Sequence, residues 1–349
     1  MLFLLLPKDE LSTLFELVSY NAVIGPTQRA ISPSGTTIYG YEFLYDFADL
    51  VLDHTMTAHS AKEHFLPHIQ TVARYTLNGP TWEKKSDHHN AAPTVFFGMH
   101  ACDINALNKL DRVLLDTAYP DPEYTVRRRN TFIIGIDCVP QPHCFCRSLG
   151  CDTVQHGYDM FLTDIGDDYF CEVNSSKAYE VLRGVRTREP DNHANAQFMN
   201  ASAVRRKSFE NEVDTTDLIR ILDLEFEAKA WIEWGKRCLS CGTCANVCPT
   251  CYCYGAEHEI DLDLKSARKK KRLYSCNIVD FAEVSGGFNF RPESHVRLKY
   301  RYYHKHRGFV EAYEEPLCVG CGRCGRACLA GITVPEVIAS IREEAAVDG

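Results

Sequence analysis

The chain has 349 residues, of which 45% are hydrophobic, so it is long enough to form two domains with cores of their own. Its net charge of -9 argues against a nucleic-acid-binding protein, because phosphate binding needs a basic surface. Its 17 cysteines would indicate a disulfide scaffold only in a short secreted chain, so we expect reduced thiols.

The apolar start of the chain does not have the pattern of an export signal. Residues 1–6 have no basic segment before them, and they end at Pro7 without a small-residue cleavage site. No other apolar run approaches the roughly 18 residues that a membrane span needs. We therefore expect a cytoplasmic protein without a membrane span.

The first predicted helix follows Asp9, a candidate N-cap. Its apolar positions have the spacing i, i+3, i+4, i+7 and are expected to face the core: Leu11, Leu14, Phe15 and Val18. Further on, Asp87, His88 and His89 are candidate metal ligands. Adjacent residues in a charged segment are more often solvated, and we favour a solvated loop.

Two buried strands are predicted at residues 94–99 and 131–136, with a helix between them that Asp103 is expected to cap. The strand-helix-strand order predicts parallel neighbours, whose carboxyl ends open on one crevice. Cys102 follows the first strand and Cys138 follows the second. These two thiols are therefore expected to converge.

Two more thiols, Cys144 and Cys146, follow the second strand closely. Together with Cys102 and Cys138 they form a candidate ligand set for a third iron-sulfur cluster, with Cys151 as a spare. The alternative is that these thiols are simply buried, because free cysteine packs like a small hydrophobic residue. The irregular spacing leaves both interpretations open.

A predicted hairpin joins residues 158–163 to residues 169–173, and Cys171 in its second strand is expected to be a core thiol. The chain then turns polar from residue 174 to residue 208, which indicates a domain boundary nearby. We expect an α+β protein with an amino-terminal α/β domain at residues 1–212. An all-helical ferredoxin-like domain with two clusters is expected at residues 213–349.

Two cysteine runs with the spacing C-x2-C-x2-C-x3-C dominate the last third of the chain. This spacing lets three thiolates of one loop hold one [4Fe-4S] cluster, while the fourth commonly reaches the other cluster. We therefore predict two [4Fe-4S] clusters. The hypothesis for the first ligand set is Cys238, Cys241, Cys244 and Cys328. The hypothesis for the second set is Cys318, Cys321, Cys324 and Cys248.

Structural zinc sites are the main alternative for these runs, since zinc also binds C-x2-C pairs. Zinc sites usually separate two such pairs by a dozen or more residues, whereas here a third cysteine follows at once and Pro249 ends the first run. Leu329 stands where the second run would have its proline. Since proline is not a ligand, this difference removes no thiolate.

Cys251, Cys253 and Cys276 lie outside both quartets and are expected either to pack inertly or to donate hydrogen bonds to a cluster. The basic run at residues 269–272 is interpreted as a solvated loop, and the alternative is a docking patch for an acidic partner. No nucleotide, flavin, haem or hydrolase motif is present. Clusters without such a motif are typical of a protein that carries single electrons between cofactors of other subunits.

These motifs resemble a known family, the two-cluster iron-sulfur subunits of cytoplasmic hydrogenases and sulfite reductases. The similarity rests on A-C-D-I-N-A-L from Ala101, C-F-C-R-S-L-G from Cys144, R-C-L-S-C-G-T-C-A-N-V-C-P-T-C-Y-C-Y from Arg237 and C-V-G-C-G-R-C from Cys318. The nearest resemblance is to beta subunits of nickel-iron sulfhydrogenases, and the second is to the iron-sulfur subunits of anaerobic sulfite reductases.

The resemblance implies an electron-transfer subunit that sits beside a flavin subunit handling NAD(P)H and a catalytic hydrogenase or sulfite reductase subunit. The two quartets match the cluster cysteines of the family, and Cys102, Cys138, Cys144 and Cys146 match its amino-terminal cysteine positions. Two functions of other classes remain open. One is direct reduction of polysulfide or a disulfide at an amino-terminal cluster, and the other is a zinc-bearing assembly protein.

Overall fold

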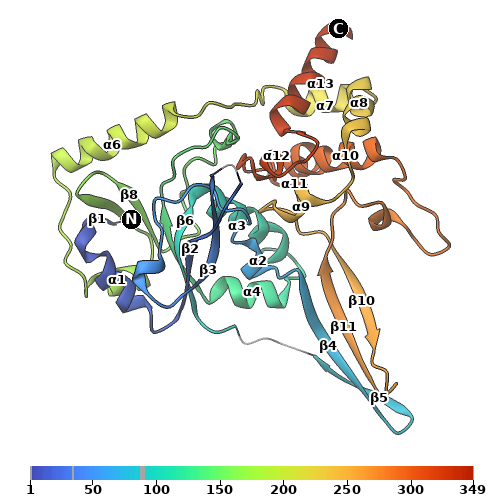
Figure 1. Ribbon diagram of the computed structural model, residues 1–349, viewed down its shortest axis with the longest axis horizontal. Helices are drawn as coiled ribbons and strands as arrows, with labels where there is room; N and C mark the ends of the chain where they lie inside the picture. Colours follow the sequence, from blue (N-terminus) through green and yellow to red (C-terminus); the bar gives the residue numbers. More distant parts are fainter. Residues whose placement is uncertain (1, 34, 87–90, 349) are drawn as a thin grey trace.

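A computed structural model describes residues 2–33, 35–86 and 91–348 of the chain. The expected solvated loop at Asp87, His88 and His89 lies outside the described residues. The fold has two sheets, one of seven strands and one of four (Figure 1). No helix in the described part of the chain is long and apolar enough to cross a membrane.

The seven-stranded sheet has the strand order β1-β9-β8-β7-β6-β2-β3. Its strands are β1 (Leu2–Pro7), β2 (Ala22–Ile31), β3 (Thr37–Leu44), β6 (Thr94–His100), β7 (Thr131–Ile136), β8 (Met160–Asp164) and β9 (Asp168–Val173). Strands β2, β6, β7 and β8 run parallel at the centre, whereas β3, β9 and β1 add antiparallel edges. The predicted parallel pair β6–β7 and the predicted hairpin β8–β9 are thus confirmed.

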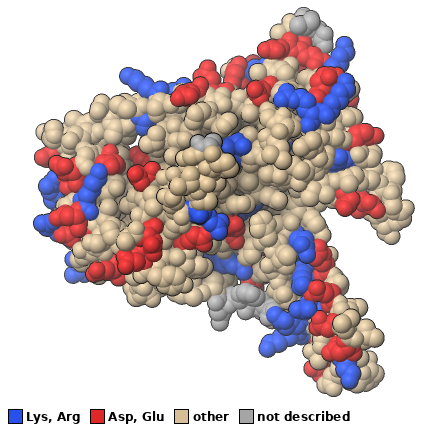
Figure 2. All heavy atoms as spheres, in the orientation of Figure 1, with Lys and Arg blue, Asp and Glu red and all other residues tan. Residues whose placement is uncertain are grey.

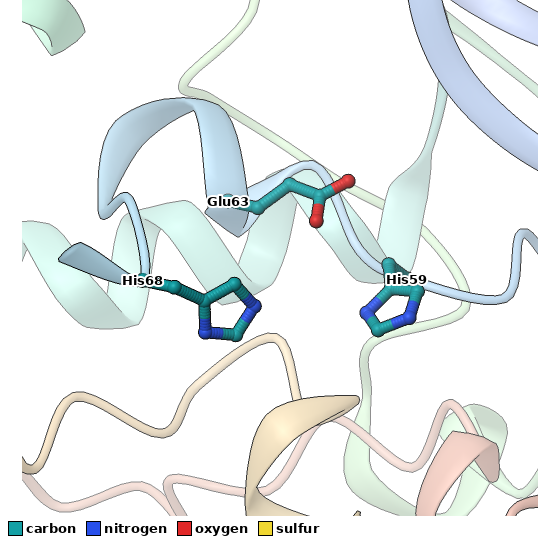
Figure 3. A group of neighbouring side chains, drawn as sticks. All are labelled: His59, Glu63 and His68. Atoms are coloured by element: carbon teal, nitrogen blue, oxygen red, sulfur yellow. The ribbon is translucent and has the colours of Figure 1, made fainter. Parts of the chain in front are cut away.

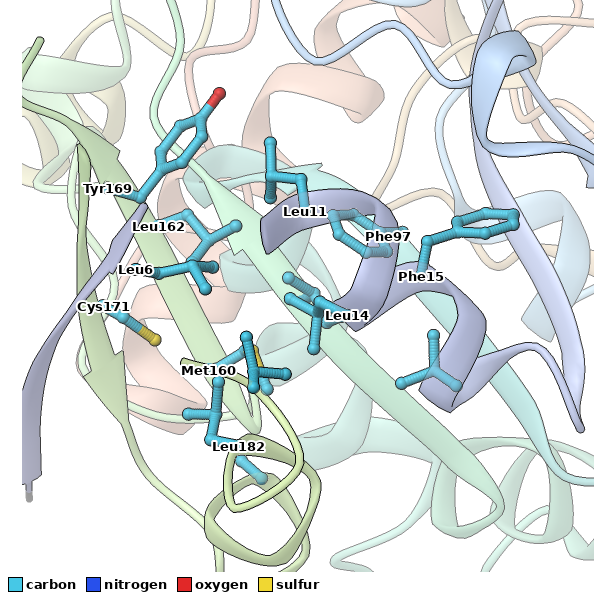
Figure 4. Packing of buried hydrophobic residues seen from close by; sticks show 14 of the residues in the cluster. Leu6, Leu11, Leu14, Phe15, Phe97, Met160, Leu162, Tyr169, Cys171 and Leu182 are labelled. Atoms are coloured by element: carbon cyan, nitrogen blue, oxygen red, sulfur yellow. The ribbon is translucent and has the colours of Figure 1, made fainter. Parts of the chain in front are cut away.

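Both faces of the central strands are buried, which explains their nearly continuous apolar sequences. On one face, α1 (Leu11–Val18) and α5 (Ser176–Leu182) pack over alternate residues of the strands (Figure 4). On the other face lie α2 (Lys62–Phe65), α3 (Ala101–Leu114) and α4 (Pro122–Arg129). In β6, for example, Phe97 faces the first helix layer and Phe96 faces the second.

Three predictions for these helices and strands can be checked directly. The four predicted core positions of the first helix are all buried, and Cys171 is fully buried in the same core. Asp103, however, does not cap α3. The N-cap is His100, and Asp103 lies in the first turn, where its carboxylate is buried.

The carboxyl-terminal part of the chain is not all-helical, so that prediction is wrong. Strands β10 (Tyr254–Ile260) and β11 (Ser266–Leu273) form an antiparallel hairpin. Strand β11 also pairs with β4 (Ile69–Asn78), which pairs with β5 (Thr81–Ser86). The resulting four-stranded sheet forms an arm that projects from the body of the molecule (Figure 1) and combines strands from both sides of residue 212. The boundary after residue 212 stays a prediction.

The basic run 269–272 is part of β11 and not a solvated loop, which corrects a second prediction. Lys270 pairs with Glu259 and Arg272 pairs with Glu257 across the sheet, and Lys271 pairs with Asp121, the N-cap residue of α4. Cross-strand pairs of opposite charge stabilise a sheet that has few apolar residues. Figure 2 accordingly shows acidic and basic side chains interspersed along the arm.

Helices surround the two cysteine runs and share a core of their own. They are α7 (Leu218–Leu224), α8 (Lys229–Arg237), α9 (Thr243–Asn246), α10 (Ser294–Tyr303), α11 (Phe309–Tyr313), α12 (Arg323–Arg326) and α13 (Val334–Asp348). A π-helical turn, His304–Gly308, joins α10 to α11. Helix α6 (Asn192–Lys207) lies at the opposite end of the molecule and packs Ala194 and Phe198 against the β1–β9 edge (Figure 1).

Candidate iron-sulfur sites

The two cysteine runs adopt the same local backbone. In each C-x2-C segment the second intervening residue, Ser240 or Gly320, has a positive φ of 51° or 68°. The glycine after the second cysteine, Gly242 or Gly322, has a φ of 79° or 76° and precedes a single helical turn. Such left-handed residues curl a loop so that successive thiols point inward. The sequence duplication is therefore also a duplication of loop shape.

The first thiol group comes mainly from the first run. Its cavity is lined by Leu298 and Ile332 from the helical core, by Arg301, and by five cysteines: Cys238, Cys241, Cys244, Cys324 and Cys328. Asn277 donates a hydrogen bond from Nδ2 to the Cys244 sulfur over 3.2 Å. The four residues predicted for the first cluster thus surround one space, and Cys328 reaches it from the other run.

The second thiol group lies deeper. Its cavity is lined by Phe145, Arg301, Lys305 and four cysteines: Cys248, Cys318, Cys321 and Cys324. Cys248 comes from the first run, so the fourth cysteine of each run lines the cavity of the other run. Cys324 lines both cavities, which therefore adjoin. Each cavity is therefore lined by three cysteines of one run and the fourth cysteine of the other run.

Positive charge is concentrated beside the second group. Arg301 and Lys305 are 5% and 3% exposed, and neither forms an ion pair with a carboxylate in the described part of the chain. The Arg301 Nε is buried without a hydrogen-bond partner. Buried cations need a counter-charge. A set of thiolates around an iron-sulfur cluster supplies negative charge at this place, so the residues present fit such a group.

The thiol of Cys248 responds to this environment. A hydrogen bond from Cys251 and the positive charges of Lys305 and Arg301 hold the pKa of Cys248 well below its usual value. Iron binds the thiolate and not the thiol, so a lowered pKa favours metal binding at neutral pH.

Cys102, Cys138, Cys144 and Cys146 also come together, as the strand order predicted. Cys102 lies in the first turn of α3 after β6, Cys138 follows β7, and Cys146 begins a 3₁₀ turn. All four line one cavity, together with His100 and Cys321. Burial raises the pKa of Cys102 well above its usual value and that of Cys138 to about 12, so a metal bound here would have to displace protons from these two thiols.

Cys151, the expected spare, lies in the same packed cluster but does not line this cavity, and its sulfur approaches the Leu149 carbonyl. Cys321 lines both this cavity and the second one. The backbone closes the junction through a 2.8 Å hydrogen bond from the Phe145 amide to the Gly320 carbonyl. The three thiol groups therefore form a continuous series in which neighbouring cavities share a cysteine.

Three further cysteines lie beside the second group. The sequence did not predict that these three lie close together. Cys251 adjoins Cys248, and Cys253 is hydrogen-bonded to Cys276. Lys62 of α2 is 4% exposed and donates to the Cys251 carbonyl over 3.0 Å. The C-x2-C-x-C spacing from Cys248 was a signal for Cys251 and Cys253, but Cys276 and Lys62 come from distant segments that only the fold brings here.

Comparisons with known proteins agree with this chemistry. Residues 237–332 match the family described as 4Fe-4S dicluster domain. The chain is also 36% identical, over 328 residues, to sulfhydrogenase 2 subunit beta of Pyrococcus furiosus, and the alignment covers 92% of each chain. No solved structure matches it. With this identity over nearly its whole length, and with the dicluster domain at its two cysteine runs, the chain belongs to the family of sulfhydrogenase beta subunits.

Proposed function

We propose that this protein is the electron-transfer iron-sulfur subunit of a multi-subunit oxidoreductase. It relays electrons between a flavin subunit that handles NAD(P)H and a catalytic subunit, which we propose to be a nickel-iron sulfhydrogenase. The observation that carries the proposal is the series of three adjoining thiol groups linked through Cys324 and Cys321. A [4Fe-4S] cluster, when bound, supplies reversible one-electron chemistry.

The ligand sets in this proposal are the two quartets and the amino-terminal four cysteines. Cys238, Cys241, Cys244 and Cys328 would hold one [4Fe-4S] cluster, and Cys248, Cys318, Cys321 and Cys324 would hold the second. Cys102, Cys138, Cys144 and Cys146 would hold a third iron-sulfur cluster. Apolar side chains such as Leu298, Ile332 and Val334 line part of the first cavity.

The first thiol group offers a partner subunit an approach to the series. Cys241 of the first group is exposed, and the neighbouring Leu239 and Leu329 are 62% and 86% exposed. Exposed apolar side chains beside a redox site favour contact with another protein. At the other end of the series three thiols of the third group are buried and Cys138 is half-buried, so electrons that pass along the series would cross the body of the protein.

Iron and acid-labile sulfide analysis of anaerobically purified protein tests the ligand sets. We expect about twelve irons per chain, and about eight after Cys102→Ser and Cys138→Ser, with the remaining clusters unchanged in their electron paramagnetic resonance signals. About eight irons in the unaltered protein would remove the third cluster. A colourless protein without labile sulfide would overturn the proposal as a whole.

The relay itself is tested with partners. NAD(P)H is expected to reduce the clusters only when a flavin subunit is added, and the isolated chain is expected to have no activity on polysulfide. Polysulfide reduction by the isolated chain would select the direct enzyme instead. Co-purification with a sirohaem protein in place of a nickel-iron subunit would select a sulfite reductase.

A further inference from the structure

A group of three side chains outside the thiol series has the chemistry of metal ligands. His59 precedes α2, Glu63 lies within it, and His68 comes directly before β4. One ligand atom from each residue lies within 4.8 Å of the other two. Figure 3 shows the two rings and the carboxylate directed toward a common space.

These three side chains have no other evident task. In the ranges that the structure describes, no hydrogen bond or ion pair engages either imidazole ring or the Glu63 carboxylate. The ligand atoms are close, but the group is not held together by direct bonds among its members. Two ligands that each lie about 2.0–2.2 Å from a zinc ion stand at most about 4.4 Å apart, so small side-chain rotations would complete a site.

Lys62 precedes Glu63 in α2, so its side chain is the nearest lysine along the chain to this group. The Lys62 ammonium does not occupy the group itself, because it points away to the Cys251 carbonyl.

We propose that His59, Glu63 and His68 bind one divalent transition-metal ion, with zinc as the occupant. Two imidazoles and one carboxylate are a donor set that zinc favours, whereas magnesium and calcium favour oxygen ligands alone. Three protein ligands leave at least one position for water. Because His68 is exposed, solvent reaches this position.

The site has a clear structural consequence. An ion bound there would connect α2 to the start of β4, which is one of the four strands of the projecting arm. It also lies next to Lys62, which contacts the loop of the second thiol group. The inference depends on neither iron nor the proposed function, since none of its ligands is a cysteine.

Metal analysis of the complete chain with its iron in place tests this inference. The protein is purified anaerobically, incubated with zinc, desalted and analysed for zinc and iron together. We expect one zinc per chain, which Glu63→Gln and the double variant His59→Ala with His68→Ala reduce at least tenfold without changing the iron content. The control His258→Ala, an exposed histidine on β10, keeps its zinc.

Cobalt distinguishes this site from the thiol groups. In the difference spectrum against the same protein without cobalt, cobalt at the proposed site is expected to give weak visible bands without new thiolate-to-cobalt charge-transfer absorption, and Glu63→Gln is expected to abolish them. Zinc that stays in the variants, strong charge-transfer absorption, or binding that does not survive desalting would each overturn the inference. Loss of iron with retention of zinc would assign the zinc to cysteines and would also overturn it.

Discussion

A buried cation ordinarily pairs with a carboxylate. Lys305 is buried beside a threonine and thiols instead. Its ammonium donates to the Thr250 hydroxyl over 2.8 Å, and it lines the cavity of the second thiol group. Burial alone would lower the pKa of Lys305, but the negative charge of the Cys248 thiolate outweighs burial and raises it. The lysine is therefore charged, and its charge acts on whatever this cavity holds.

The substitution Lys305→Met is expected to lower the reduction potential of the cluster proposed for the second cavity. Reduction adds negative charge, and the nearby ammonium favours the reduced state. The expected shift is on the order of 60 mV, which is a tenfold change for a one-electron couple. A redox titration followed by electron paramagnetic resonance measures it. Lys177→Met, an exposed lysine on α5, serves as the control, and equal potentials in both variants would contradict the argument.

His54 shows the effect of burial on a different group. Its ring stacks on His100 with centroids 4.0 Å apart, and its Nδ1 lies 3.1 Å from the Val51 carbonyl. Burial lowers the pKa of His54 from 6.5 to about 4. In the folded protein the ring therefore stays neutral at pH values where it would be charged in the unfolded chain.

Stability is consequently expected to fall as the pH drops below about 6.5. His54 then binds a proton in the unfolded chain but not in the folded protein. The free energy of unfolding therefore falls by about 1.4 kcal/mol per pH unit until the pH reaches about 4. Between pH 7.5 and pH 5.5 the anaerobic unfolding temperature should drop by a few degrees. His54→Gln should make this slope shallower, because only the other histidines whose pKa is lowered by burial, such as His100 and His304, would then contribute to it, whereas His193→Gln on the surface of α6 should not. Parallel slopes in all three proteins would refute the assignment.

At the scale of secondary-structure elements, the sequence predicted the helices and strands whose apolar residues recur at a regular spacing. The first helix, the parallel pair β6–β7 and the hairpin β8–β9 belong to this class. Strands β10 and β11 were missed because five of the eight residues of β11 are Lys or Arg, and some of these pair across the sheet with Glu257 and Glu259 of β10. Spacing alone grouped the two quartets. It could not place Lys62 beside Cys251 or Cys276 beside Cys253, because these contacts join segments that are far apart in the sequence.

The loops of the two runs depend on glycines at particular places. A Cβ at Gly322 would lie 2.2 Å from the His143 carbonyl oxygen, and one at Gly320 would lie 2.7 Å from the Cys146 backbone. The second run therefore packs directly against the segment that carries Cys144 and Cys146. Only a residue without a side chain allows this close approach.

The substitution Gly322→Ala is expected to separate the second and third thiol groups. Gly286→Ala is the matched control, because Gly286 has a similar positive φ of 91° but open space around it. The control should lose about 1–3 kcal/mol from backbone strain alone. Gly322→Ala should lose more than the control and should also lose iron. Equal losses and full iron content in both variants would show that the close approach is unimportant.

At the scale of the whole molecule, the two halves of the chain interlock. The four-stranded sheet takes β4 and β5 from the first half and β10 and β11 from the second. A second connection is a buried ion pair between Arg323 of α12 and Asp103 of α3, in which both side chains are 1% exposed. The guanidinium makes two 2.7 Å hydrogen bonds to the carboxylate and further bonds to Thr57. Each partner adjoins a proposed cluster ligand, Cys102 or Cys324, so this pair sets the positions of two thiol groups together.

The substitution Asp103→Asn tests whether this pair holds the halves together. It leaves the Arg323 charge buried without a counter-charge, so the free energy of unfolding should fall by about 3–5 kcal/mol. Asp164→Asn, which removes the partner of Lys8 in an exposed pair, should cost at most about 1 kcal/mol. Thermal unfolding and limited proteolysis compare the two variants. Adding Arg323→Met to Asp103→Asn should restore part of the loss, because the double variant buries no unpaired charge. If Asp103→Asn were no less stable than Asp164→Asn, the β-sheet arm and core packing alone would join the halves.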